Sequence, residues 1–203
     1  MVEDVGFVYL LHNESQVLQS SVDQSRDASI ISLIINNGLF LNEVTQLKLE
    51  AINWAEKTLH IDGKRARKLP LNGQTLALMT TWSQKRVDCK TDHFFITTKG
   101  KVSPLSARSV DNLIRKYAKK AGINKVVNAR VLRNTFAVRL FETGLSEMEV
   151  AALLGVTNQD FLKRYQNGAK KIQTGSESSL DAMEKLDTRN PFTKLKDRLI
   201  KAK

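Results

Sequence analysis

Apolar residues recur every four positions within residues 130–141, at Leu132, Phe136 and Leu140. This spacing places the three side chains on one face of an α-helix, and neighbouring apolar residues widen that face. Gly144 follows the last apolar residue and is positioned to end the helix. The sequence therefore predicts a helix with one buried face, which needs a core to pack against.

A second short helix is predicted directly after the first. Ser146, with Glu149 three residues later, matches a capping box that opens a helix, and Gly155 is placed near its end. Arg133 lies next to the apolar face of the first helix, where an arginine needs a partner. One interpretation pairs Arg133 with a carboxylate or lets its charged end reach water.

The order of residues from 130 to 165 resembles the tyrosine recombinase, or phage integrase, family. That family carries His-x-x-Arg at the start of a buried helix, then Leu-Leu-Gly-His, and a nucleophilic tyrosine nine residues beyond the second histidine. In this chain Arg130 and Arg133 occupy the His-x-x-Arg positions. Val156 follows the Leu-Leu-Gly of residues 153–155, and Tyr165 lies nine residues after Val156. The family's spacing is kept, whereas two of its residue types are replaced.

The resemblance extends over residues 27–165 and implies a fold. We expect an α+β, predominantly helical chain: the tyrosine recombinase catalytic-domain fold with a small antiparallel β-sheet. This domain is predicted at residues 1–172, followed by a linker and a C-terminal helical tail at residues 173–203. In the family such a tail often docks in trans, so a homo-oligomer or a partner recombinase is its expected contact. The family's separate N-terminal DNA-clamping domain is expected to be absent.

Local patterns predict the remaining elements. A strongly apolar segment at residues 27–37, followed by Gly38, predicts a buried helix and its end. The other predictions are a short, weakly patterned helical start at residues 3–12 and 14–22, a helix at 42–49, strands at 58–61 and 67–71 joined by a hairpin at Asp62-Gly63, a helix at 74–86, a strand at 93–97, a helix from a Ser106 or Ser109 cap to about residue 121, a flexible linker at 166–179, and short helices at 180–186 and 192–200.

Positive charge is unevenly distributed along the 203 residues, whose formal net charge is +11. Residues 1–59 carry 3 basic and 8 acidic side chains, whereas residues 60–120 carry 14 basic and 4 acidic ones. A basic face attracts polyanions, so we expect double-stranded DNA as a partner, bound less tightly as salt rises. The alternative is a basic protein without a nucleic-acid partner. The predicted DNA contacts are Arg65, Arg67, Lys68, Lys101, Arg108, Arg115 and Lys119.

Composition argues against other classes of site. No apolar run reaches 18 residues, so no membrane segment is predicted. One cysteine, Cys89, excludes an internal disulfide, and with only three scattered histidines it argues against a metal site. We expect a cytoplasmic, nucleoid-associated protein without a cofactor.

The resemblance also implies a chemistry. In this family the tyrosine oxygen attacks the scissile phosphate and forms a covalent protein–DNA link. Two arginines hold the non-bridging oxygens, a lysine protonates the leaving sugar oxygen, and the histidine positions donate hydrogen bonds. No metal is needed. The implied catalytic residues are Tyr165 as nucleophile, Arg133 as one clamp arginine, Arg130 as a donor, and Lys64 as the lysine, with Arg65 or Arg67 as alternatives to Lys64.

Besides Arg130, which stands in place of a histidine, two positions depart from the family pattern and carry no donor in their side chains. Phe40 follows Gly38-Leu39 where the family has Gly-Leu-Arg, and Val156 stands where the second histidine would be. Losing one preorganised donor costs about 10²–10³ in rate. We therefore expect a DNA-binding protein with impaired catalysis, a pseudo-recombinase. The alternatives are an active recombinase with an unusual clamp of Arg130, Arg133 and Lys64, and a protein-interaction module that does not bind DNA.

Overall fold

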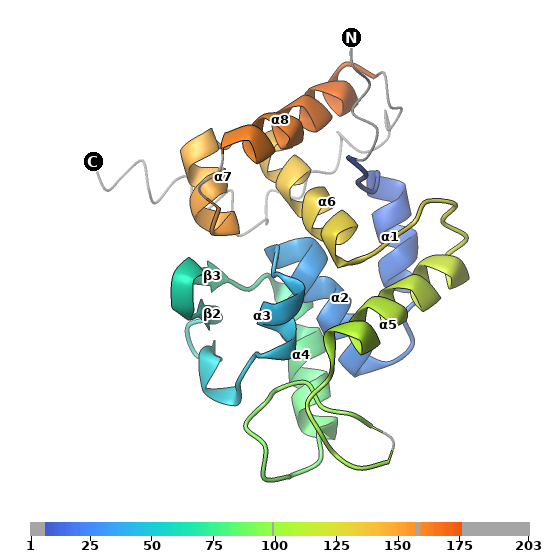
Figure 1. The fold of residues 1–203 in the computed structure, drawn as a ribbon, viewed down its shortest axis with the longest axis vertical. Helices are drawn as coiled ribbons and strands as arrows, with labels where there is room; N and C mark the ends of the chain where they lie inside the picture. Colours follow the sequence, from blue (N-terminus) through green and yellow to red (C-terminus); the bar gives the residue numbers. More distant parts are fainter. Residues whose placement is uncertain (1–6, 99, 157–158, 176–203) are drawn as a thin grey trace.

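The computed structural model describes residues 7–98, 100–156 and 159–175 (Figure 1). Its α-helices are α1 His12–Ser20, α2 Ser25–Asn37, α3 Leu41–Thr45, α4 Gly73–Lys85, α5 Ala107–Lys120, α6 Ala129–Glu142, α7 Glu147–Leu154 and α8 Gln159–Gln173. Its strands are β1 Ile52–Asn53, β2 Thr58–Ile61 and β3 Arg67–Pro70, with 3₁₀ turns at Leu49–Ala51 and Gly63–Arg65. The predicted helical fold with a small antiparallel sheet is confirmed.

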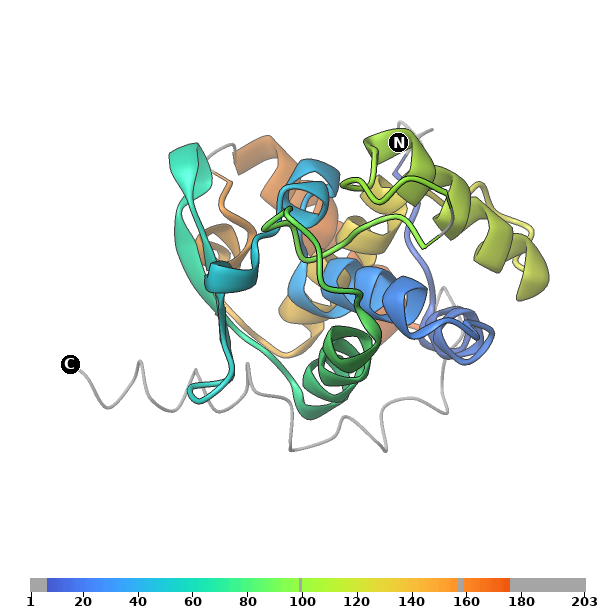
Figure 2. The same cartoon turned by 90° about the horizontal axis from the view of Figure 1, so that it is seen from below.

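Helix α2 lies at the centre of the molecule (Figures 1 and 2). It packs against α4 and α6, and α8 crosses α6 on the far side of α6 from α5. The side chains of Ile30, Ile31, Leu33, Ile34 and Ile35 are all fully buried. A helix that is apolar on every side is stable only when other elements enclose it, which is the position that α2 occupies.

The two helices predicted from residues 130–155 form as expected. The Asn128 side chain caps α6 by accepting from the Val131 amide at 3.0 Å. Ser146 and Glu149 make the predicted capping box at the start of α7. Gly155 ends α7 in the left-handed conformation, with φ of 62°.

The sheet has the order β1-β2-β3 and is antiparallel throughout. Ile61 of β2 pairs with Arg67 of β3, so residues 62–66 connect the two strands. The predicted hairpin is therefore present, but its connection is a five-residue loop that contains a 3₁₀ turn. Gly63 begins this turn with φ of 85°.

Three predicted elements differ in the structure. The helix predicted at 42–49 ends at Thr45, because the Leu47 carbonyl instead accepts from the Phe94 amide at 2.7 Å. The strand predicted at 93–97 does not join the sheet and makes only isolated bridges, such as that between His93 and Lys48. The helix predicted at 3–12 is absent over residues 7–11, which have no regular structure before α1.

The linker predicted at 166–179 is wrong over its first half, because α8 continues through Gln173. Gly168, which suggested flexibility, is buried inside α8. A Cβ there would lie 3.0 Å from Val138, 3.2 Å from Phe7 and 3.3 Å from Tyr9. Glycine therefore allows a close approach between α8, α6 and the N-terminal segment. The helices predicted at 180–186 and 192–200, and the tail contact, lie outside the described residues.

Residues 7–11 form an N-terminal segment that runs across the helices at the other end of the chain. The Leu10 amide donates to Thr135 Oγ1 at 2.9 Å, and Asn134 Nδ2 donates to the Val8 carbonyl at 2.9 Å. This segment thereby joins the beginning of the chain to α6. Within the described ranges no helix combines the length and apolarity that a bilayer crossing requires.

Candidate functional site

Arg133 lies in the first turns of α6 and is buried, with 6% of the residue exposed. Its Nη1 donates to the Gly38 carbonyl, and its Nη2 donates to the Leu154 carbonyl at 2.8 Å. The partners of Arg133 are therefore the carbonyl groups at the ends of α2 and α7, and neither a carboxylate nor water is needed to explain its burial. Burial lowers the pKa of Arg133 to about 10, so the side chain stays charged at neutral pH.

Phe40 lines the same place. Its ring centroid lies 3.4 Å from the guanidinium carbon of Arg133 and 4.3 Å from that of Arg65. The ring therefore occupies space beside the clamp arginine, at the position where the family pattern has a second arginine. A guanidinium over an aromatic face is stabilised by the ring quadrupole.

Tyr165 lies on α8 and is also buried, with 6% exposed. Its ring packs against the ring of Phe7, with centroids 5.6 Å apart. Burial raises the pKa of the Tyr165 phenol, while the positive charges of Arg133, Arg130 and Arg164 act to lower it. Arg133 on α6 and Tyr165 on α8 therefore interact electrostatically, and the two helices that carry them pack against each other.

The other two positions from the family pattern differ in their exposure. Arg130 is exposed at the start of α6, and its charge reaches the Tyr165 phenol. Val156 directly follows the end of α7 and packs, partly buried, against the core. Its side chain carries no donor.

The hairpin supplies basic residues of two kinds. Lys64 and Arg65 are exposed in the loop between β2 and β3. Arg67 instead forms a bidentate ion pair with Glu43, with Nη1–Oε1 and Nη2–Oε2 distances of 2.7 and 2.8 Å. Its Nε also donates to the Leu153 carbonyl at 2.9 Å. Arg67 is thus held by protein groups and joins the hairpin to α3 and α7.

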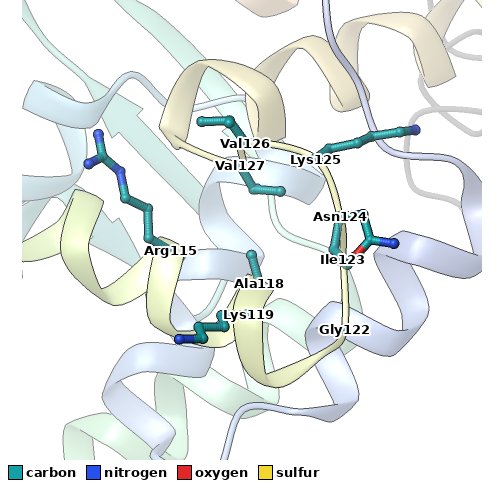
Figure 3. A pocket seen from close by; sticks show the side chains of 9 residues that line it. All are labelled: Arg115, Ala118, Lys119, Gly122, Ile123, Asn124, Lys125, Val126 and Val127. Atoms are coloured by element: carbon teal, nitrogen blue, oxygen red, sulfur yellow. The ribbon is translucent and has the colours of Figure 1, made fainter.

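The remaining predicted DNA contacts lie farther along the surface. Lys68 is exposed and ion-pairs with Glu56, and Lys101 and Arg108 are exposed as well. Arg115 and Lys119 project from α5 at the rim of a pocket of about 260 Å³, as Figure 3 shows. The wall opposite α5 is the segment 122–127.

A buried arginine and a buried tyrosine thus lie together, with further cations on the hairpin and at the start of α6. Within the described residues no three His, Cys, Asp or Glu side chains are grouped so that they could hold a metal ion. A model of the phage integrase family matches residues 9–171, which include every residue of this cluster. The chain belongs to the phage integrase family.

Curated relatives of this integrase-family chain are tyrosine recombinases. One from Agathobacter rectalis is 25% identical over 177 residues, covering 82% of this chain and 56% of that protein. Tyrosine recombinase XerA of Pyrococcus horikoshii is 29% identical over 152 residues, covering 73% of this chain and 53% of the relative. The chain therefore spans about half the length of these relatives.

Solved structures show the same fold. The crystal structure of XerA recombinase superimposes with a TM-score of 0.75 at 21% identity, covering 85% of this chain and 64% of that chain. XerH site-specific recombinase, in a post-cleavage complex with its palindromic difH substrate, gives a TM-score of 0.72 at 22% identity. That match covers 85% of this chain and 53% of XerH. The integrase-family chain has the tyrosine recombinase catalytic-domain fold, as predicted.

Sequence reasoning missed two contributors to the site. Phe7 contacts the Tyr165 ring although 158 positions separate them in the chain, and no local pattern signals such a contact. Glu43 was assigned no role from the sequence, yet its carboxylate holds Arg67 and also accepts from the Phe40 amide at 2.8 Å. The three-residue spacing between Phe40 and Glu43 is the one at which a glutamate accepts from the backbone amide before a helix, so it was the sequence signal for the contact with Phe40.

Proposed function

We propose that this chain binds double-stranded DNA and is impaired in strand cleavage. The observation that carries the proposal is the Phe40 ring, 3.4 Å from the Arg133 guanidinium carbon, at the position of the family's first clamp arginine. A phenyl ring cannot donate to a phosphate oxygen. Val156 carries no donor at the position of the family's second histidine. The XerH complex with difH DNA supports binding of DNA by this fold.

The chemistry that would be impaired is an exchange of phosphate esters. The Tyr165 phenol would give up its proton as its oxygen forms a bond to the scissile phosphorus. The bond to the sugar oxygen would break, and the leaving oxygen would take a proton. Negative charge on the non-bridging oxygens grows during this step, so missing donors weaken stabilisation of the transition state more than binding of the ground state. DNA affinity is then kept while the rate falls.

A test of cleavage uses the full chain and a pool of nicked duplexes with randomised sequence, which trap a covalent adduct. We expect no denaturant-resistant adduct from the wild-type chain. Phe40→Arg combined with Val156→His restores both donor positions and is expected to produce an adduct that disappears when Tyr165→Phe is added. An adduct from the wild-type chain that Tyr165→Phe removes would instead establish an active recombinase with the unusual clamp.

DNA binding is tested by fluorescence anisotropy with a random-sequence duplex at several salt concentrations. We expect log affinity to fall linearly with log salt concentration, because phosphate contacts release counterions. Absence of binding at low salt would favour the alternative of a protein-interaction module.

As part of the same proposal, the tail at residues 173–203 contacts a second protomer on cytoplasmic DNA. Sedimentation of the full chain with and without DNA checks this contact.

A further inference from the structure

Two arginines from different parts of the chain share one aromatic ring. The guanidinium carbons of Arg65 and Arg133 both lie within 4.3 Å of the Phe40 ring centroid. Arg65 belongs to the hairpin loop, Arg133 to α6, and Phe40 directly precedes α3. The ring therefore brings together two positive charges that the sequence separates by 68 residues.

Like charges in such proximity repel, and the ring offsets only part of that repulsion. Among the described residues, no carboxylate forms an ion pair with either guanidinium, since the nearby Glu43 is paired with Arg67. An anion placed between the two arginines would relieve the repulsion. The pair therefore has the charge and the planar donor groups that bind a phosphate oxygen.

The backbone of Arg65 is held in place, so the approach of its side chain to Phe40 is not accidental. The Arg65 carbonyl accepts from Arg67 Nη1 at 3.2 Å, and Arg67 is itself fixed by Glu43. On the other side, a Cβ built at Gly155 would lie 3.1 Å from the Arg65 Cβ. The hairpin thus packs closely on the end of α7, and this packing sets where Arg65 emerges.

Donor capacity remains on both arginines. A guanidinium has five N–H groups. Arg133 directs Nη1 and Nη2 at the Gly38 and Leu154 carbonyls, and each of these nitrogens carries a second hydrogen. Arg65 is exposed, so its N–H groups can reach a ligand from solvent.

We infer that Arg65, positioned by the Phe40 ring, supplies a second guanidinium that binds the same phosphate as Arg133 in the ground state, without restoring the donor that position 40 lacks for the cleavage step. This inference rests on the proposed function, because it names the group that grips the DNA phosphate at the same site. Arg65 is the phosphate-binding residue, and Phe40 is a positioning residue. Phosphate binding is thereby retained without an arginine at position 40.

The test titrates the full chain with inorganic phosphate at pH 7 and constant ionic strength, following the arginine Nε–Hε signals by NMR. We expect Arg65→Ala to weaken phosphate affinity about tenfold, the effect of losing one charge-assisted contact. Lys90→Ala removes an exposed charge from another part of the chain and is the control, with an expected change below about threefold. Equal losses from the two variants would overturn the inference, because they would indicate a diffuse basic surface.

Phe40→Leu keeps an apolar side chain and tests the platform. We expect it to weaken phosphate binding in the wild-type background and to have no further effect in Arg65→Ala, which a purely structural role would not produce. An equal additional loss in the Arg65→Ala background would reject the platform. Arg65→Lys keeps the charge but not the planar stacking, and is expected to bind phosphate less tightly than wild type.

Failure of this inference is distinguishable from failure of the proposed function. Random-sequence duplex DNA reports on the proposed function, and inorganic phosphate reports on the arginine pair. A wild-type chain that binds DNA while Arg65→Ala and Lys90→Ala behave alike retains the proposed function and loses the inference. A chain that binds phosphate through Arg65 but no DNA supports the inference and removes the proposed function.

Discussion

Arg67 is a basic residue of the hairpin that is held by other groups of the protein. In the sequence it belongs to a basic hairpin, but in the fold it is almost fully buried and paired with Glu43. A buried ion pair is costly to break from one side, because the remaining charge is left without a partner. Arg67 is therefore better placed to orient the hairpin than to contact DNA directly.

We predict that Arg67→Ala lowers the free energy of unfolding by about 3–5 kcal/mol, because the Glu43 carboxylate stays buried and unpaired. Urea unfolding at neutral pH measures this loss. Lys68→Ala is the matched control, since its ion pair with Glu56 is exposed and the unfolding midpoint should hardly move. Similar losses in both variants would show that the Arg67 pair is solvated.

A second prediction at the residue scale concerns ionisation of Tyr165. Its burial raises the phenol pKa above the ordinary value of about 10. Phenolate absorbance of wild type minus that of Tyr165→Phe should therefore rise only above pH 10. Arg130→Ala should raise the midpoint further, since a positive charge that favours the phenolate is removed. A midpoint at or below pH 10 would contradict the burial of this phenol.

The same shift links pH to stability. Unfolding lets Tyr165 ionise at its ordinary pKa, so above about pH 10 the unfolded chain binds fewer protons than the folded one. The contribution of this residue to stability is complete below that pH and is lost as the pH rises through the folded pKa. Tyr165→Phe should accordingly show a shallower loss of stability in alkali than wild type.

At the scale of elements, the end of α2 is the junction on which the site depends. Gly38 ends this helix with φ of 66°, and its carbonyl accepts from Arg133. A Cβ at this position would overlap the ring of Phe136 on α6. The glycine therefore serves both the left-handed turn and the close packing of α2 on α6.

We predict that Gly38→Ala is more destabilising than Gly122→Ala. Both glycines have similar positive φ values, 66° and 69°, so both variants carry the left-handed penalty of about 1–2 kcal/mol. Only Gly38→Ala adds overpacking, which costs about 1–3 kcal/mol more, because nothing lies within 4 Å of a Cβ at Gly122. Thermal unfolding of the two variants measures the difference in stability. Equal losses of stability would mean that Phe136 on α6 moves away from the new methyl group without destabilising the fold.

Across the whole molecule, the N-terminal segment of residues 7–11 joins α6 and α8. Phe7 reaches Tyr165, Tyr9 packs beside Gly168, and Thr135 of α6 accepts from the Leu10 amide. The two ends of the described chain are thus held together around the candidate nucleophile. Loss of this attachment should therefore weaken the packing of α8 as well as that of the segment.

We predict that Thr135→Val lowers the free energy of unfolding by about 1–3 kcal/mol, because the isosteric change leaves the buried Leu10 amide without its acceptor. Hydrogen exchange should also quicken at residues 8–11 and in α8. Thr80→Val is the control: Thr80 is exposed and, like Thr135, donates to the carbonyl four residues earlier. If both variants were equally stable, the attachment would contribute nothing.

Some of this architecture could be predicted because it is encoded locally. Helices α2, α6 and α7 combine apolar residues at helical spacing with signals at their ends, such as Gly38 and the Ser146 capping box. Short elements were less predictable. Helix α3 ends early because the backbone of Leu47 pairs with Phe94, and no residue near 47 encodes that partner.

The helical fold class, the spacing from Arg130 to Tyr165, and the replacement of donors at Phe40 and Val156 follow from the order of residues. Periodicity and caps express such properties within a few residues. The pairing of Arg67 with Glu43, and the approach of Arg65 and Arg133 to one ring, arise in the folded molecule. Such contacts join residues from distant parts of the chain, so their partners exist only once the core has brought those elements together.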